Sequence, residues 1–139
     1  MLDTNVISEV MKPSPSEAVV DWLNRQQSDR LHLSSVTIGE IEYGLRIVPD
    51  GRRRRDLQNR FKRLVAAAFA LRVLSYDEPA ALCYGEIMAA RKALGRPISM
   101  PDGQIAAIAR ANGGAVATHN TRDFQECGIE LIDPFVAGS

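Results

Sequence analysis

Four acidic residues stand at junctions between the secondary-structure elements expected from this sequence, where a carboxylate can act on a ligand. They are Asp3, Glu40, Asp102 and Asp123. Carboxylates brought together repel one another, and burial raises some of their pKa values unless a cation binds among them. Oxygen ligands without a thiolate or imidazole cluster favour Mg²⁺ or Mn²⁺ over zinc. Such a metal activates water and neutralises charge at a phosphoryl group, so a phosphodiester is a suitable substrate.

Each acid also has a purely structural explanation. Asp3 and Asp102 stand near helix starts, where aspartate is a common N-cap. Thr37 and Glu40 fit the capping box S/T-x-x-E, and Asp123 fits a turn. The metal site is therefore favoured by the set of four acids and not by any one of them.

Two of these assignments have a nearby alternative. Glu42 competes with Glu40, but side chains two residues apart on a helix point about 200° apart, so only one can face the site. Gly44, one turn beyond Glu40, leaves room for a ligand and favours Glu40. At the first junction, Asn5 is able to cap the helix, which would leave Asp3 free for a metal.

Short apolar segments alternate with longer segments of helical periodicity. The expected strand segments are Met1–Leu2, Leu31–Leu33, Val73–Leu74, Ala115–Ala117 and Ile129–Ile132. The expected helices start at a capping box of Ser14 and Glu17, at Thr37, near the arginine run 52–55, after Asp77 and at Pro101. This alternation is typical of βαβ units, and it predicts an α/β fold, a three-layer α/β/α sandwich with a central parallel β-sheet.

The order of these elements places the acids at one edge of the sheet. In open parallel sheets, ligands bind beyond the carboxyl ends of the strands, where the strand order reverses. Asp3 and the segment 118–123 both leave strands at that edge. Only two residues precede Asp3, which is short for a central strand.

Length and composition indicate one domain over residues 1–139. Cys83 and Cys127 have no CxxC spacing and no histidine cluster beside them, so neither zinc nor a disulfide framework is indicated. The sequence has no secretory signal pattern and no run of 18 apolar residues, so we expect a cytoplasmic protein without membrane contact.

The charge of the chain is balanced but unevenly distributed. Seventeen basic and seventeen acidic residues give a net charge of zero, which argues against binding nucleic acid by bulk positive charge. Residues 51–72 nevertheless contain eight basic residues and one acid. The expected RNA phosphate contacts in this run are Arg52, Arg53, Arg54 and Arg55. A solvated helix face explains the same run equally well.

Four short motifs together carry a family resemblance. They are LDTNVISE at 2–9, GEIEYG at 39–44, PDGQIAAIA at 101–109 and ATHNTRDF at 117–124. In order and spacing they resemble the PIN-domain nucleases, most closely the VapC/FitB-type toxins of bacterial type II toxin–antitoxin modules. The resemblance covers the whole chain and implies the PIN-like α/β/α fold.

The same resemblance implies roles for individual residues. It assigns Asp3, Glu40, Asp102 and Asp123 to binding one or two Mg²⁺ or Mn²⁺ ions and positioning water for phosphodiester cleavage. It assigns supporting roles to three polar residues of the motifs, Asn5, Thr118 and Asn120. His119 receives no role from it.

The implied function is that of a metal-dependent endoribonuclease toxin neutralised by a small cognate antitoxin. The resemblance further implies a homodimer, a heterotetramer or larger complex with the antitoxin, and contact with promoter DNA only through the antitoxin. Two other functions stay open: a housekeeping PIN ribonuclease in RNA processing, and a weakly active antitoxin-binding subunit of a DNA-binding regulatory complex.

Overall fold

The centre of the fold is a parallel sheet of very short strands, seen in a computed structural model that describes residues 1–69 and 72–136. Two pairs of strands form it: β1 (Leu33–Ser34) with β2 (Val73–Leu74), and β3 (Val116–Ala117) with β4 (Leu131–Ile132). Leu2 joins the two pairs through parallel bridges to Leu33 and Ala117. The order across the sheet is therefore β2, β1, Leu2, β3, β4.

Backbone hydrogen bonds hold the first residues in the middle of this sheet. The N–H of Leu2 donates to the carbonyl of His32 at 2.9 Å, and the N–H of Asp3 donates to that of Ala117 at 2.9 Å. Strand order reverses at Leu2, because β1 and β2 lie on one side of it and β3 and β4 on the other. Asp3 thus leaves the sheet at the switch point, where ligands of such folds bind.

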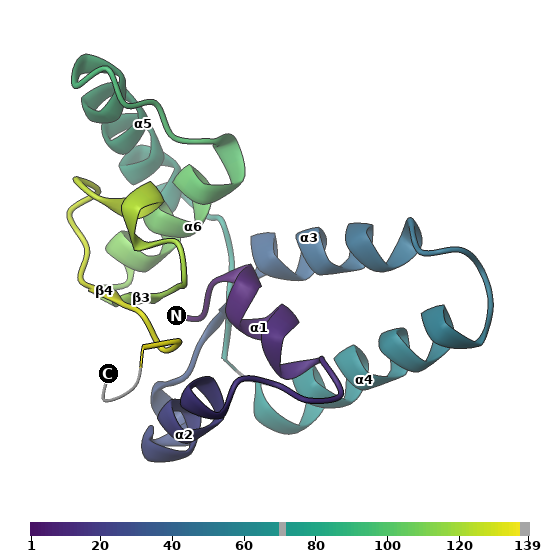
Figure 1. Ribbon diagram of the computed structural model, residues 1–139. Coiled ribbons are helices and arrows are strands. Elements are labelled where there is room, and N and C mark those ends of the chain that lie inside the picture. The colour runs from purple at the N-terminus through teal and green to yellow at the C-terminus, as the bar shows by residue number, and fades with distance from the viewer. Residues whose placement is uncertain (70–71, 137–139) are drawn as a thin grey trace.

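Helices cover the sheet in two groups (Figure 1). One group contains α1 (Thr4–Val10), α2 (Glu17–Arg25), α3 (Ser35–Arg46) and α4 (Arg52–Ala68), and the other contains α5 (Glu78–Ala93) and α6 (Met100–Ala111). Short 3₁₀ turns, η1 (Ser28–Arg30) and η2 (Thr121–Phe124), complete the elements. In Figure 1, α3 and α4 extend side by side away from the sheet. Within the described part of the chain, no helix is long and apolar enough to span a bilayer.

Neighbouring residues of β3 and of β4 pack in two different apolar cores. Val116 of β3 packs in the core that contains residues of α5 and α6, whereas Ala117 packs in the core built by α1 to α4. Leu131 and Ile132 of β4 divide in the same way. Successive side chains of a strand point to opposite faces, so the two cores lie on the two faces of the sheet. The predicted α/β fold with a parallel sheet is confirmed, and its helices form a layer on each face.

The helix starts differ from the predicted capping boxes. The N-cap of α2 is Ser16, not Ser14, and the N-cap of α3 is Ser34, whose Oγ accepts from the N–H of Thr37 at 3.0 Å. The capping box that was the structural alternative for Glu40 is therefore not formed, and α3 begins two residues before the predicted start at Thr37. Ser34 is the last residue of β1 and is fully buried. The end of strand β1 therefore determines where α3 begins, and the capping pattern in the local sequence does not.

Candidate metal centre

A pocket of about 500 Å³ opens at the carboxyl edge of the sheet, where α1, α3 and α6 meet. We call it the acidic pocket; it is lined by Asp3, Thr4, Asn5, Ser8, Glu9, Lys12, Glu40, Asp102, His119, Asn120 and Phe135. Three of the four predicted metal ligands, Asp3, Glu40 and Asp102, are among these residues. The fourth, Asp123, is not.

Asp3 both caps α1 and lines the pocket. Its Oδ1 accepts from the N–H of Thr4 at 2.8 Å, and its Oδ2 accepts from the hydroxyl of Thr118 at 2.8 Å. The alternative in which Asn5 caps the helix is wrong. Each carboxylate oxygen can accept more than one bond, so capping leaves capacity for a cation. The two hydrogen bonds from Thr4 and Thr118 also fix the direction in which the Asp3 carboxylate points.

Glu40 is supplied by α3 and has no capping role, because Ser34 caps that helix. Its Oε1 accepts from the hydroxyl of Thr4 at 2.6 Å, which leaves Oε2 available. Its competitor Glu42 pairs with Arg46 at 2.8 Å on the exposed side of α3 and does not line the pocket.

Asp102 enters the pocket from the first turn of α6. The N-cap of this helix is Ser99, whose Oγ accepts from the N–H of Asp102 at 3.3 Å. The carboxylate of Asp102 is therefore free of the capping role that its position suggested. Burial raises its pKa, the hydrogen bond with Ser99 opposes this, and the charges of Glu40 and Asp123 raise it further.

The electrostatics of the pocket fit a cation. The pKa of Asp3 is raised from 3.8 to about 6: burial is the largest cause, the hydrogen bonds from Thr118 and Thr4 oppose it, and the charges of Asp102 and Glu40 add to it. Carboxylates with a raised pKa are stabilised by any positive charge placed among them. Within the described residues, no three His, Cys, Asp or Glu side chains are placed to hold one metal ion together, so an ion in this pocket would need water among its ligands. Mg²⁺ suits such an open donor set, because it commonly keeps several waters and binds few carboxylates.

A hydrogen-bond network steadies this centre. The amide nitrogen Nδ2 of Asn5 donates to Thr118 Oγ1 at 3.1 Å, and the N–H of Asn120 donates to the same oxygen at 3.0 Å. Thr118 in turn donates to Asp3, so its hydroxyl has one donated and two accepted bonds. The three residues predicted to support the site therefore all connect to Asp3 through one buried hydroxyl.

Asp123 lies outside the acidic pocket, on the exposed side of η2. Its backbone carbonyl accepts from the guanidinium of the buried Arg91 at 2.9 Å, and Gln125 contributes a second carbonyl at 2.7 Å. These bonds hold the turn in place. Asn120, three residues earlier, lines the pocket instead.

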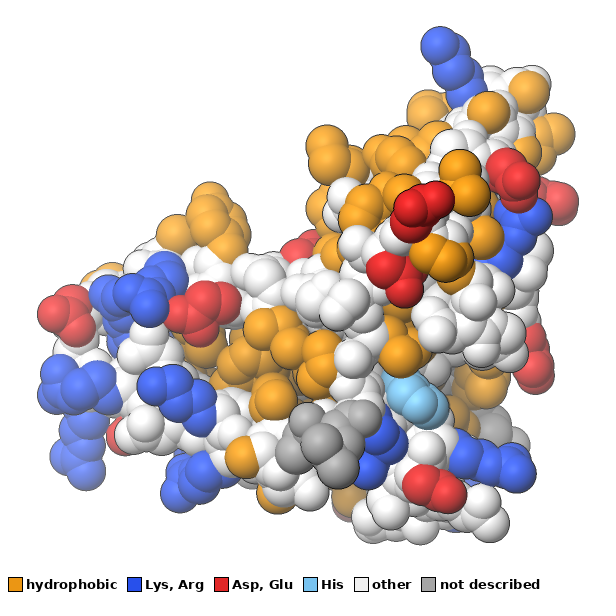
Figure 2. Space-filling model, turned by 180° about the vertical axis from the view of Figure 1, so that it is seen from behind, with side chains coloured by type: hydrophobic (Ala, Val, Ile, Leu, Met, Phe, Trp, Pro, Cys, Tyr) orange, Lys and Arg blue, Asp and Glu red, His pale blue; other side chains and the backbone are white. Residues whose placement is uncertain are grey.

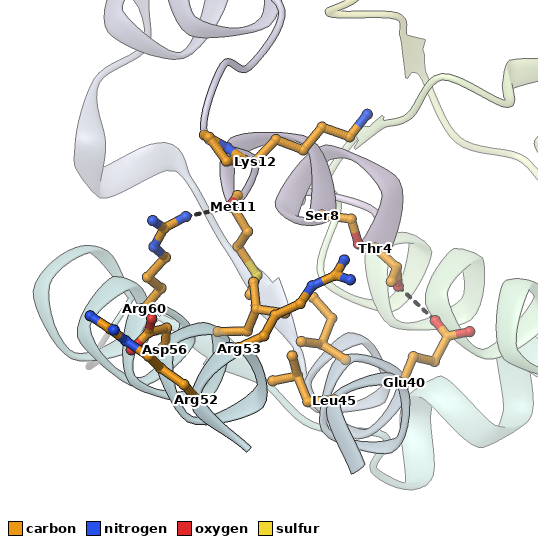
Figure 3. A pocket seen from close by; sticks show the side chains of 14 residues that line it. Thr4, Ser8, Met11, Lys12, Glu40, Leu45, Arg52, Arg53, Asp56 and Arg60 are labelled. Carbon is orange, nitrogen blue, oxygen red and sulfur yellow. Dashed lines mark hydrogen bonds between the residues drawn. The ribbon is translucent and has the colours of Figure 1, made fainter. Parts of the chain in front are cut away.

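A second, larger cavity of about 730 Å³ adjoins the acidic pocket between α1, α3 and α4 (Figure 3). The two share Thr4, Ser8, Lys12 and Glu40 as lining residues. We call it the α4 cavity; apolar side chains such as Met11 and Leu45 line much of it.

The arginine run meets this cavity at the start of α4. Arg52 and Arg53 line the cavity, whereas Arg54 and Arg55 do not. In Figure 3 the side chain of Arg53 extends from α4 into the cavity, on the side of Thr4 and Glu40. Figure 2 shows basic side chains gathered around the α3–α4 end of the molecule.

Several residues of the acidic pocket carried no functional prediction from the sequence. A role for Thr4 could have been predicted, because it is a hydroxyl residue directly beside the candidate ligand Asp3. Lys12, which pairs with Glu9 at 3.0 Å, lies just beyond the end of α1. His119 and Phe135 come together only because the chain returns to the pocket after β4, and no local pattern indicates that.

The chain is similar to known proteins over nearly its whole length. The sequence profile of the PIN domain matches residues 1–129. The chain is 43% identical over 135 residues to VapC ribonuclease Y4jK of Sinorhizobium fredii, covering 97% of this chain and 96% of that protein. It is 36% identical to toxin FitB of Neisseria gonorrhoeae, covering 97% of each. A solved structure of FitAB bound to an IR36 DNA fragment matches 99% of this chain and 96% of that one, with a TM-score of 0.91 and 35% identity.

Proposed function

The chain belongs to the PIN-domain family, and from this premise we propose that it is a metal-dependent endoribonuclease, the toxin of a bacterial toxin–antitoxin module. The observation that carries the proposal is the acidic pocket, in which Asp3, Glu40 and Asp102 from three separate elements line one space at the switch point of the sheet. The ribonuclease and toxin relatives match nearly the full chain and support the same function. An RNA substrate would place the activity in the cytoplasm.

Each residue of the centre has a distinct task in this proposal. Asp3 and Asp102, with Glu40, would hold Mg²⁺ or Mn²⁺. The ion supplies charge neutralisation at the phosphoryl oxygens and lowers the pKa of the attacking water. Thr118 and Thr4 orient the carboxylates of Asp3 and Glu40 by the bonds described above. The net reaction is hydrolysis of one phosphodiester bond.

Asn120 and Asp123 have separate parts. Asn120 is proposed as a neutral oxygen donor or phosphate contact at the wall of the pocket. Asp123 is proposed to act from outside the pocket through its negative charge, which raises the pKa of Asp102 and also attracts a cation to that carboxylate. This assigns Asp123 a weaker role than that of the three lining acids.

We propose a small antitoxin as the partner of this chain. The zero net charge of the chain suits a protein that reaches promoter DNA only through such a partner. The solved FitAB complex on DNA supports this arrangement. The α4 cavity, which shares four residues with the acidic pocket, offers an apolar surface from which an antitoxin segment would block the site.

The direct test combines biochemistry and expression. Purified protein should cut RNA with Mg²⁺ or Mn²⁺ and should stop when EDTA is added. Expression of the chain alone should arrest growth, and co-expression of the neighbouring small reading frame should restore it. RNA cleavage without growth arrest would instead support a housekeeping RNA-processing nuclease. Antitoxin binding without cleavage in any divalent metal would support the regulatory subunit.

The arginines of α4 give a separate prediction. Positive charges in the first turn of a helix oppose its dipole, so the arginine run is not explained by helix stability. Replacing Arg52 and Arg53 with glutamine should weaken RNA binding and reduce the slope of log affinity against log salt by about 0.7 for each phosphate that is no longer neutralised. Metal affinity should not change.

The matched control lies on the same helix. Arg63, near the other end of α4, lines neither the acidic pocket nor the α4 cavity, so Arg63→Gln should leave the salt slope unchanged. Equal slopes for the wild type and the Arg52/Arg53 variant would assign these arginines to solvent or to the antitoxin.

A further inference from the structure

The rim of the acidic pocket carries a pair of aromatic rings that the proposed metal chemistry does not use. His119 follows β3 and Phe135 follows β4, and their ring centroids lie 4.4 Å apart with 41° between the ring planes. Both residues line the pocket together with Asp3 and Asp102. The side chain of His119 remains 57% exposed, so its ring is not explained as part of a core.

The rings are fixed on the same framework as the acidic centre. The N–H of His119 donates to Asn5 Oδ1 at 3.2 Å, and the other end of the Asn5 amide donates to Thr118, the residue that orients Asp3. Asn5 therefore links the backbone of His119 to the carboxylate of Asp3. A group resting on the ring would keep a fixed position relative to a metal held by that carboxylate.

Asp133 holds the other side of the pair. Its Oδ1 accepts from the N–H of Phe135 at 2.9 Å and lies 3.5 Å from Nδ1 of His119. Phe135 also packs partly against the apolar core of α1 to α4. Phe135 is thus an anchored support, and His119 is the ring that faces outward from it.

We propose that His119, backed by Phe135, is a stacking subsite for one nucleobase of single-stranded RNA beside the scissile phosphate. This inference rests on the proposed ribonuclease function and adds how the substrate is held. A flat, exposed ring in a pocket that otherwise presents carboxylates, amides and hydroxyls suits a ligand with a phosphate and an aromatic base. Single-stranded RNA is commonly recognised by bases stacked on aromatic side chains, histidine included. At about 500 Å³, the pocket falls in the range of small-ligand sites, about 300–1,000 Å³.

Two substitutions of His119 separate stacking from proton transfer. His119→Ala removes the ring, and we expect KM for a short single-stranded RNA to rise about tenfold, with a smaller change in kcat. His119→Phe keeps a stacking ring without an ionisable nitrogen and should retain a KM near that of the wild type. If His119 acted as a general acid or base, both variants would lose kcat equally.

Stacking can also be observed without cleavage. An RNA carrying 2-aminopurine should lose fluorescence when mixed with the wild type, before products form, because stacking quenches this base. His119→Phe should keep the quenching and His119→Ala should lose most of it. The matched control is His32→Ala, because His32 lies before β1 and does not line the acidic pocket.

The outcomes separate this inference from the function on which it rests. Unchanged KM and quenching in His119→Ala would overturn the subsite, as would equal losses in His119→Ala and His119→Phe. If the wild type quenches the probe, His119→Ala does not, and no RNA is cut in any divalent metal, the proposed nuclease function fails while stacking of a base on His119 stands. If the wild type cuts RNA without quenching the probe at any position along it, the subsite fails and the function stands.

Discussion

Asp102→Asn should reduce RNA cleavage by at least about 100-fold and abolish growth arrest, while the protein stays folded. The carboxylate lies in the acidic pocket, and helix α6 is capped by Ser99, so the substitution removes a negative charge without removing a cap. Initial rates of RNA cleavage at saturating Mg²⁺ or Mn²⁺, with thermal unfolding as a check on folding, measure this.

Two comparison variants make the result specific. Asp123→Asn alters an acid outside the pocket. We expect it to reduce the cleavage rate by less than about tenfold, because the charge of Asp123 acts on Asp102 only from a distance. Asp21→Asn alters an exposed residue of α2 and should leave the cleavage rate unchanged. Equal losses at Asp102 and Asp123 would place both acids on the metal. Full activity of Asp102→Asn would refute the proposed centre.

Asp3→Asn should raise the stability of the metal-free protein at pH 7 by about 2 kcal/mol. The pKa of Asp3 is raised from 3.8 to about 6 in the folded protein, chiefly by burial. Between these values the folded state binds more protons than the unfolded state, so stability falls as pH rises and stays low above about pH 6. The shift corresponds to about 3 kcal/mol. Asparagine avoids this cost and can accept from the Thr4 N–H through its single amide oxygen, but it loses the bond that the Thr118 hydroxyl donates, which offsets about 1 kcal/mol of the gain.

Denaturant unfolding from pH 4 to pH 7 in EDTA tests this prediction. The difference between Asp3→Asn and the wild type should be small at pH 4 and grow towards pH 7. Adding Mn²⁺ at pH 7 should stabilise the wild type and not the variant, because a ligand stabilises the state that binds it. A variant that is less stable than the wild type at every pH would show that Asp3 serves folding alone.

The sequence predicted the layout of the fold better than its helix starts. Strand positions such as Val73–Leu74 were correct because alternating apolar and helical segments indicate which residues enter the core. The starts at Ser14 and Thr37 were wrong because several hydroxyl residues within one turn fit the same capping pattern. The structure chooses Ser34 for α3 because this residue ends a buried strand, and that depends on contacts far along the chain.

Part of the candidate site could likewise be predicted from local sequence, and part depends on contacts between distant residues. That Asp3, Glu40 and Asp102 lie close together could be predicted because each stands at a predicted junction and parallel strands gather such junctions at one edge. Asp123 stands at a junction too, but the hydrogen bonds from Arg91 to the backbone of this segment place η2 so that Asn120 lines the pocket. The position of that turn is a result of tertiary packing, which spacing in the sequence does not indicate.

The position of Leu2 at the middle of the sheet bears on when the acidic pocket forms during synthesis of the chain. Leu2 pairs with residues on both halves of the sheet, and the bond from Thr118 to Asp3 joins residues 115 positions apart. Contacts of such separation form late in folding, because a long loop must close first. The contacts that position Asp3 therefore form only after β3 and β4 have left the ribosome, so the acidic pocket is incomplete until nearly the whole chain has been synthesised.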